Sequence, residues 1–206
     1  MSGTFALMFR FPYPMENPVE IIPMGVAILT KLPVTKTLAQ YYKGDPDNLP
    51  VFVKYVEGGA DNMAGVLLSV SIDVSGISYT LGTTHFTWTD KGAADDRQRR
   101  DLKSLFEKLD TFTDGIVFAG DLNAPRGREI FDEIAKRFKD NIPPEYETSL
   151  DQDLHRAPEE VKHLMVDGLF STPEYSVTNA SLNFGVSDHA AIVADIAKIQ
   201  KEEGTF

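Results

Sequence analysis

The chain has 206 residues, 42% of them hydrophobic and 25% charged, and this length and composition suit a single globular domain, expected over residues 1–206, with no apolar stretch long enough to span a membrane. The formal net charge of −11 at pH 7 disfavours tight, sequence-independent binding to duplex nucleic acid, which draws most of its affinity from Lys and Arg on phosphates. The absence of cysteine excludes disulfides, thiolate metal sites and cysteine nucleophiles, and it fits a reducing compartment such as the cytoplasm.

Runs rich in Val, Ile, Phe and Thr, separated by Gly, Pro and Asp, predict eight strands. The fourth run ends in clear apolar–polar alternation, and the pair Ser75-Gly76 after it predicts a tight hairpin turn into the fifth. The predicted strands are Thr4–Phe11, Met24–Thr30, Val51–Val56, Ala64–Val74, Ile77–Thr84, Gly115–Ala119, Leu164–Ser171 and Ala190–Ile196.

Helical spacing of apolar residues predicts two firm helices, Ala93–Leu109 and Arg128–Phe138, and a shorter helix is expected over Thr37–Tyr42. The polar, proline-containing stretch Asn141–Glu160 predicts a long loop, and long ordered loops are often functional. Mixed strands with two strong helices indicate an α/β or α+β fold.

Two short polar strings follow or precede predicted strands. Gly120-Asp121-Leu122-Asn123-Ala124-Pro125 comes directly after one, and Ser187-Asp188-His189 comes directly before another. Asp and Asn can hold Mg²⁺ and orient a water molecule, and His can move a proton or contact a phosphate. Taken singly, the first string is also good turn chemistry and Ser-Asp is a good helix N-cap.

The order of further motifs carries a family resemblance. The segments "GVAILTKLPV", "LGTTHFTW", "VFAGDLNAPRG", "MVDGLFSTPEY" and "GVSDHAAIVADI", from roughly Phe5 to Ile196, together resemble the endonuclease/exonuclease/phosphatase family of metal-dependent phosphoesterases. The resemblance implies a four-layer sandwich of two packed β-sheets with helices outside.

The resemblance also implies roles for the carboxylates and the amide. Asp121 would orient or deprotonate the attacking water, and Asn123 would bind the substrate by donating to a phosphate oxygen. Asp188 would be a ligand of Mg²⁺ or Mn²⁺, together with Asp121, and Asp167 would orient a histidine. The alternatives are a turn for Asp121 and Asn123 and an N-cap for Asp188.

Two histidines and two possible substrate contacts complete the expected site. His189 would contact the phosphate, and His85 would protonate the leaving oxygen or bind phosphate, although either imidazole can be purely structural. Trp88 could stack on a substrate ring or simply pack, and Arg126 could face an anionic substrate or be a solvated charge. The remaining loop histidine His155, like Arg156 and His163, is interpreted as mostly structural, although His155 and Arg156 could reach a phosphate.

The family normally opens with strands that carry a metal-binding Glu, and this chain resembles the family only from the segment after them. Glu16 and Glu20 lie in a Pro-rich stretch and do not match that motif. We therefore expect an N-terminally truncated domain with weak Mg²⁺ affinity, unless a partner or second copy supplies the missing strands.

Three functional hypotheses follow. The first is a metal-dependent phosphoesterase that hydrolyses a phosphodiester or phosphomonoester by in-line attack of water. The second is a non-catalytic remnant or assembly subunit that binds a phosphorylated ligand, and the third is a nuclease, which the acidic composition disfavours. The substrate class is open between a phosphorylated small molecule and a nucleic acid.

Overall fold

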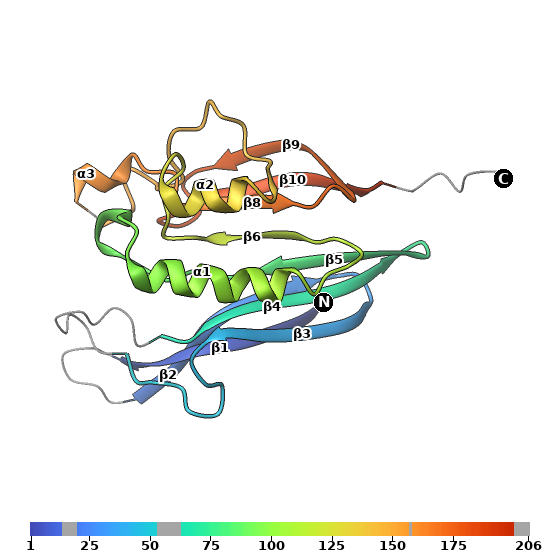
Figure 1. Cartoon of the computed structure of the whole chain (residues 1–206), viewed down its shortest axis with the longest axis horizontal. Helices are drawn as coiled ribbons and strands as arrows, with labels where there is room; N and C mark the ends of the chain where they lie inside the picture. The colour runs from blue at the N-terminus through green and yellow to red at the C-terminus, as the bar shows by residue number, and fades with distance from the viewer. Residues whose placement is uncertain (14–19, 53–62, 157, 200–206) are drawn as a thin grey trace.

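A six-stranded sheet forms the central layer of the protein (Figure 1). The computed structural model describes residues 1–13, 20–52, 63–156 and 158–199. In the described part of the chain the sheet has the strand order β3-β4-β5-β6-β8-β7, and its strands are β3 (Val34–Lys43), β4 (Gly65–Val74), β5 (Ile77–Thr83), β6 (Val117–Asp121), β7 (Lys139–Asp140) and β8 (Asp167–Ser171).

Two antiparallel hairpins and a few helices accompany this sheet. The hairpins pair β1 (Ser2–Tyr13) with β2 (Glu20–Thr30), and β9 (Tyr175–Asn183) with β10 (Ala191–Lys198). The helices are α1 (Asp96–Leu109), α2 (Glu129–Ala135) and α3 (Glu159–Lys162), with a 3₁₀ turn at Asp90–Gly92. None of the described helices is both long and apolar enough to cross a membrane.

The two faces of the central sheet bury different partners, because alternate residues of a strand point to opposite faces. In β4, Leu67 packs with α1 and α2 in the largest core cluster, whereas Val66 and Leu68 pack against β1. Tyr79 and Leu81 of β5 lie on the same face as Val66 and pack against β9 and β10. Both hairpins therefore cover one face of the sheet, and the helices cover the other.

This arrangement confirms the expected mixed α+β architecture. The layer that packs on the central sheet consists of two separate two-stranded sheets, and α1 and α2 lie on the opposite side of the central sheet. The predicted turn at Ser75-Gly76 is also confirmed. Its two residues have φ values of 54° and 84°, which a two-residue turn between β4 and β5 requires.

The helix expected over Thr37–Tyr42 is wrong, because this segment lies within strand β3. It pairs antiparallel with β4 along almost its whole length, and Tyr42 is buried against the helical layer. Strand pairing and burial thus override a weak local helical preference. Of the strand predicted at Val51–Val56, residues 53–56 lie outside the described residues, and Val51 forms an isolated parallel bridge with Arg10.

The other element boundaries shift by a few residues. Helix α1 begins at Asp96 because the Asp95 carboxylate caps it, accepting from the Gln98 backbone N–H at 2.9 Å. Helix α2 ends at Ala135, earlier than predicted, yet Phe138 still packs into the core beside it.

Candidate functional site

Strand pairing brings the polar residues at the strand ends together. Asp121 ends β6 and lies directly opposite Asp167, the first residue of the antiparallel strand β8. The segment after β5 runs alongside β6, since the Phe86 N–H donates to the Asp121 carbonyl at 2.8 Å. This contact places His85, which precedes Phe86, beside the same strand end.

Four of these side chains form a continuous row. His85 Nε2 lies 3.6 Å from Asp121 Oδ2, and His189 Nε2 lies 4.0 Å from the same oxygen. On the far side, His189 Nδ1 lies 2.7 Å from Asp167 Oδ2. An ionised carboxylate only accepts hydrogen bonds, so Nδ1 donates to Asp167 and the Nε2 edge of the ring faces Asp121.

The charges in this row shift the affinity of its members for protons. Burial on its own lowers the pKa of His189, but the hydrogen bond and charge of Asp167, with the charges of Asp121 and Asp188, raise it to about 9. Burial raises the pKa of Asp121, assisted by the charge of Asp167 and opposed by His85 and His189. A raised carboxylate pKa makes Asp121 a stronger base than an ordinary aspartate.

A tight turn after β6 fixes Asn123 next to Asp121. The Asn123 backbone N–H donates to Asp121 Oδ1 at 2.8 Å, and Asn123 adopts a φ of 47°, which asparagine tolerates better than most residues. Its side-chain amide donates to the Phe86 carbonyl at 2.9 Å and has a second N–H left for another acceptor. Gly120 is required here, because a Cβ at this position would lie 1.8 Å from the Thr84 carbonyl oxygen.

A cavity of about 300 Å³ opens in front of this row. Asp121, Asn123 and His189 line it together with Trp88, a residue that is 41% exposed. The predicted site residues His85, Asp167 and Asp188 are not among its lining residues. The remaining lining residues are Thr89, Asp90, Lys91, Gly92, Leu150, His155, Pro158, Val161, Leu164 and Val166.

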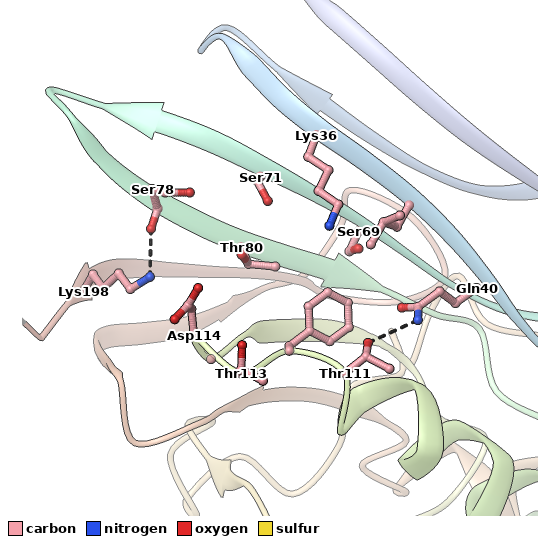
Figure 2. A pocket seen from close by; sticks show the side chains of 13 residues that line it. Lys36, Gln40, Ser69, Ser71, Ser78, Thr80, Thr111, Thr113, Asp114 and Lys198 are labelled. Atoms are coloured by element: carbon pink, nitrogen blue, oxygen red, sulfur yellow. Dashed lines mark hydrogen bonds between the residues drawn. The ribbon is translucent and has the colours of Figure 1, made fainter.

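A larger cavity, of about 430 Å³, lies between strands β3, β4 and β5 and the segment that precedes β6 (Figure 2). Serine and threonine hydroxyls line it, with Lys36, Lys198 and the carboxylate of Asp114. It contains none of the site residues predicted from the sequence and no histidine, so it lacks the acid–base pairs of the first cavity.

His155, interpreted from the sequence as mostly structural, lies in the first cavity. Its ring packs against His189 with centroids 5.4 Å apart, and its ligand atom lies within 4.8 Å of those of Asp188 and His189. Burial and the charge of His189 lower its pKa. Among the described residues this trio can hold a metal ion, and the group does not include Asp121. The only sequence signal for His155 was its place in a long polar loop.

Arg126 is committed to contacts within the protein. Its guanidinium forms an ion pair with Asp140 at 2.8 Å and donates to the carbonyls of Ile142, Pro143 and Tyr146. It therefore ties the long loop to the end of β7 and is not among the residues that line the cavity.

Comparison with known proteins places this arrangement in context. The sequence profile described as the endonuclease/exonuclease/phosphatase family matches residues 5–190. A comparison with curated proteins gives no match. Several solved structures are similar, all at identities that show the fold alone.

One similar structure is an endonuclease/exonuclease/phosphatase from Beutenbergia cavernae, with 18% identity and a TM-score of 0.66 over 95% of this chain and 53% of that chain. Another, from Bacteroides vulgatus, has 16% identity and a TM-score of 0.61 over 96% and 76%. The human Nocturnin catalytic domain with bound sulfate has 16% identity and a TM-score of 0.59 over 96% and 72%. This chain thus spans about half the length of the first structure.

Proposed function

This chain belongs to the endonuclease/exonuclease/phosphatase family, and from that premise we propose that it hydrolyses a phosphate ester by in-line attack of water, assisted by a divalent metal ion. The observation that carries the proposal is the row from His85 through Asp121 and His189 to Asp167, with separations of 3.6, 4.0 and 2.7 Å. It supplies a base, imidazoles that can donate protons and an orienting carboxylate side by side, and Asp121 and His189 of the row line the cavity.

The residues present fit a divalent cation. The Asp188 carboxylate, predicted as a ligand of Mg²⁺ or Mn²⁺, is more than a third exposed and lies beside the imidazoles of His155 and His189, which line the cavity. Asp121 is the other predicted ligand, and its Oδ2 lies 4.0 Å from His189 Nε2. A bound cation would offset the negative charge that develops on the phosphoryl oxygens.

Asp121 is the base in this proposal. It accepts a proton from the water as the water oxygen attacks phosphorus, and its raised pKa favours that transfer. The Asn123 turn holds the carboxylate, since the Asn123 backbone N–H occupies Oδ1 and leaves Oδ2 toward the histidines. The free N–H of the Asn123 side chain donates to a phosphoryl oxygen as charge develops.

The two histidines beside Asp121 are the proton donors in this proposal. As the bond between phosphorus and the leaving oxygen breaks, His85 donates a proton to that oxygen, so that an alcohol leaves. His189 is held by Asp167, and in the metal-free protein its raised pKa keeps it protonated at neutral pH, so that Nε2 can donate to a phosphoryl oxygen. Asp167 is a positioning residue, because it contacts the ring and not the reacting atoms.

The size and lining of the cavity favour a small substrate. A volume of about 300 Å³ holds a phosphate group with a compact substituent, and the exposed Trp88 ring offers a stacking surface for a base or another ring. The net charge of −11 disfavours a long nucleic acid, which keeps the nuclease hypothesis behind a small phosphorylated molecule.

The test is hydrolysis of bis(4-nitrophenyl) phosphate and 4-nitrophenyl phosphate with Mg²⁺, Mn²⁺ or Co²⁺. We expect His189→Ala to lower turnover at least about 100-fold, and Asp121→Asn similarly, while folding is retained. His163→Ala is the matched control, since His163 is exposed and outside the cavity. Wild-type turnover in folded His189→Ala protein would refute the assignment. Phosphate binding without any turnover by the wild type would favour the non-catalytic hypothesis instead.

A further inference from the structure

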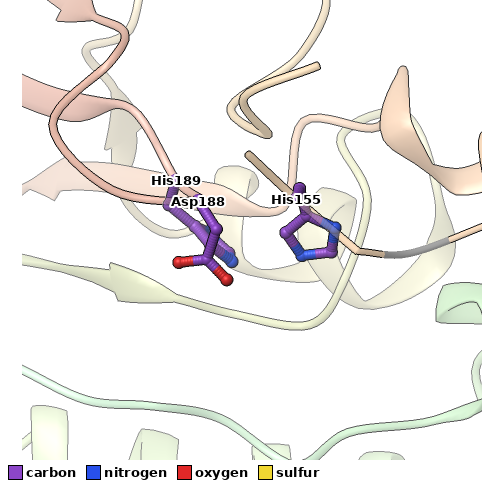
Figure 3. Close-up of side chains that lie close together, drawn as sticks. All are labelled: His155, Asp188 and His189. Carbon is purple, nitrogen blue, oxygen red and sulfur yellow. The ribbon is translucent and has the colours of Figure 1, made fainter. Parts of the chain in front are cut away.

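His155, Asp188 and His189 form a compact group of potential metal ligands at the cavity (Figure 3). One ligand atom from each lies within 4.8 Å of the others. We propose that these three residues form a site for a borderline divalent transition metal such as Co²⁺, Zn²⁺ or Mn²⁺, with His155 as a ligand. The inference deepens the proposed function and rests on it, since it names the metal class and a ligand of the same cavity.

The two loops that carry the ligands are bound to each other through Asp151. The Asp151 backbone N–H donates to the Asp188 carbonyl at 3.0 Å, and its carboxylate accepts from the Gly185 N–H at 2.7 Å. The His155 N–H donates to the Asp151 carbonyl at 2.9 Å, and Leu150 forms a bridge with His189. Asp151 is only 6% exposed. The position of His155 is therefore built by the fold and is not an accident of an exposed loop.

The contacts of His189 are those of a metal-binding histidine. Histidines that bind metals usually donate their other ring nitrogen to a carboxylate or carbonyl, which fixes the ring and its tautomer. His189 Nδ1 is paired with Asp167 at 2.7 Å, so Nε2 is the nitrogen left for a ligand. When an ion is bound, His189 would give up its Nε2 proton and hold the ion, and the charge of the ion would replace that of the protonated imidazole.

The donor set selects the metal class. Two imidazole nitrogens and one carboxylate suit Zn²⁺, Co²⁺ and Mn²⁺, whereas Mg²⁺ prefers oxygen ligands and gives up its waters reluctantly. Affinity for such nitrogen-containing sites rises from Mn²⁺ to Co²⁺. Three protein ligands also leave coordination positions for water or a phosphate oxygen, as in catalytic zinc sites.

The test is metal binding by untagged, chelator-treated protein without substrate. Co²⁺ is followed by its visible absorption, which reports nitrogen ligation, and Zn²⁺ and Mg²⁺ are measured by competition against bound Co²⁺. We expect Co²⁺ and Zn²⁺ to bind at least about 100-fold more tightly than Mg²⁺. His155→Ala should weaken Co²⁺ at least about 10-fold, because loss of a ligand costs no less than loss of a group that only orients a ligand. His163→Ala should bind as the wild type does.

A melting curve checks that His155→Ala is folded. A second test of the ligand role uses His155→Gly, in which added imidazole should restore the Co²⁺ spectrum. Equal Co²⁺ affinity in wild type and folded His155→Ala, or Mg²⁺ bound as tightly as Co²⁺, would overturn the inference. Because the binding test uses no substrate, its failure would refute the metal site and leave the proposed function to the hydrolysis assay. Tight Co²⁺ binding without hydrolysis would refute the proposed function and leave the metal site standing.

Discussion

The pairing of His189 with Asp167 gives a prediction that needs neither metal nor substrate. Asp167→Asn keeps the size of the side chain and removes its charge. In the wild type, Asp167 is the largest of the influences that raise the pKa of His189 from its ordinary 6.5 to about 9, while burial of the ring acts in the opposite direction. Without the Asp167 charge we expect the pKa of His189 to fall by about 2 units, to near 7 or below.

The same shift predicts how stability depends on pH. A histidine whose folded pKa exceeds its unfolded pKa stabilises the fold fully below the unfolded value, and that contribution is lost as pH rises through the folded value. For His189 the window runs from 6.5 to about 9. At about 1.4 kcal/mol per unit the window corresponds to about 3.5 kcal/mol, and solvent screening at this partly exposed ring should reduce the loss of unfolding free energy in the wild type to about 2 kcal/mol. Asp167→Asn should lose much less.

Two measurements check this prediction. NMR titration of the four histidine rings in chelator-treated protein gives the pKa of His189 directly. Urea unfolding at pH 6 and pH 10 gives the difference in stability. If His189 titrates within about half a unit of 6.5 in the wild type, or identically in both proteins, the reasoning on this ion pair fails.

Two further substitutions test the framework around the site. Gly120→Ala should lower the unfolding free energy by about 3 kcal/mol or more, because its Cβ would meet the Thr84 backbone oxygen at 1.8 Å. Gly127→Ala is the control. Gly127 has a φ of 77° and open space around it, so the substitution should cost only about 1 kcal/mol in the same urea titration. Arg126→Ala should lower the melting temperature and leave KM nearly unchanged, since it strips an ion pair and three carbonyl contacts from the long loop; a large rise in KM with stability intact would restore its predicted substrate contact.

The sequence predicts a strand correctly where neighbouring residues alone determine its conformation. The alternation in β4 and the Ser75-Gly76 turn depend on neighbouring residues alone, so both were correct. Strand β9 was not anticipated, because Asn179 adopts a positive φ of 53° near a register shift against β10, which breaks its alternation. Strand β3 was mistaken for a helix because its conformation is set by pairing with β4.

The residues of the candidate site likewise include some that short motifs predict and one that depends on distant contacts. Asp121 and Asp167 sit at strand ends, where β6 and β8 pair, so their meeting could be inferred from short motifs. The position of His155 could not, because it depends on Asp151 binding a distant loop through Gly185 and the Asp188 backbone. Nothing in the residues around His155 indicates that contact.

The balance of charge in the cavity leads to a last prediction. Asp121, Asp167 and Asp188 all act on His189, so protonation of one imidazole leaves carboxylates facing a phosphate group. A phosphate dianion therefore binds poorly until a cation is added. Asp188→Asn removes one repelling charge and one proposed metal ligand. It should therefore favour phosphate binding in the metal-free protein and weaken it when metal is added.

Metal-free Asp188→Asn protein should bind inorganic phosphate a few-fold more tightly than the metal-free wild type, as expected for removing one charge at a partly exposed site. The gain in phosphate affinity that Co²⁺ or Mn²⁺ gives the wild type should be largely lost in the variant. Calorimetric titration of phosphate with and without metal measures both effects in one experiment. Phosphate binding by the wild type that is tight without metal and indifferent to Asp188→Asn would show that the carboxylates do not control access of the anion, and that other groups neutralise it.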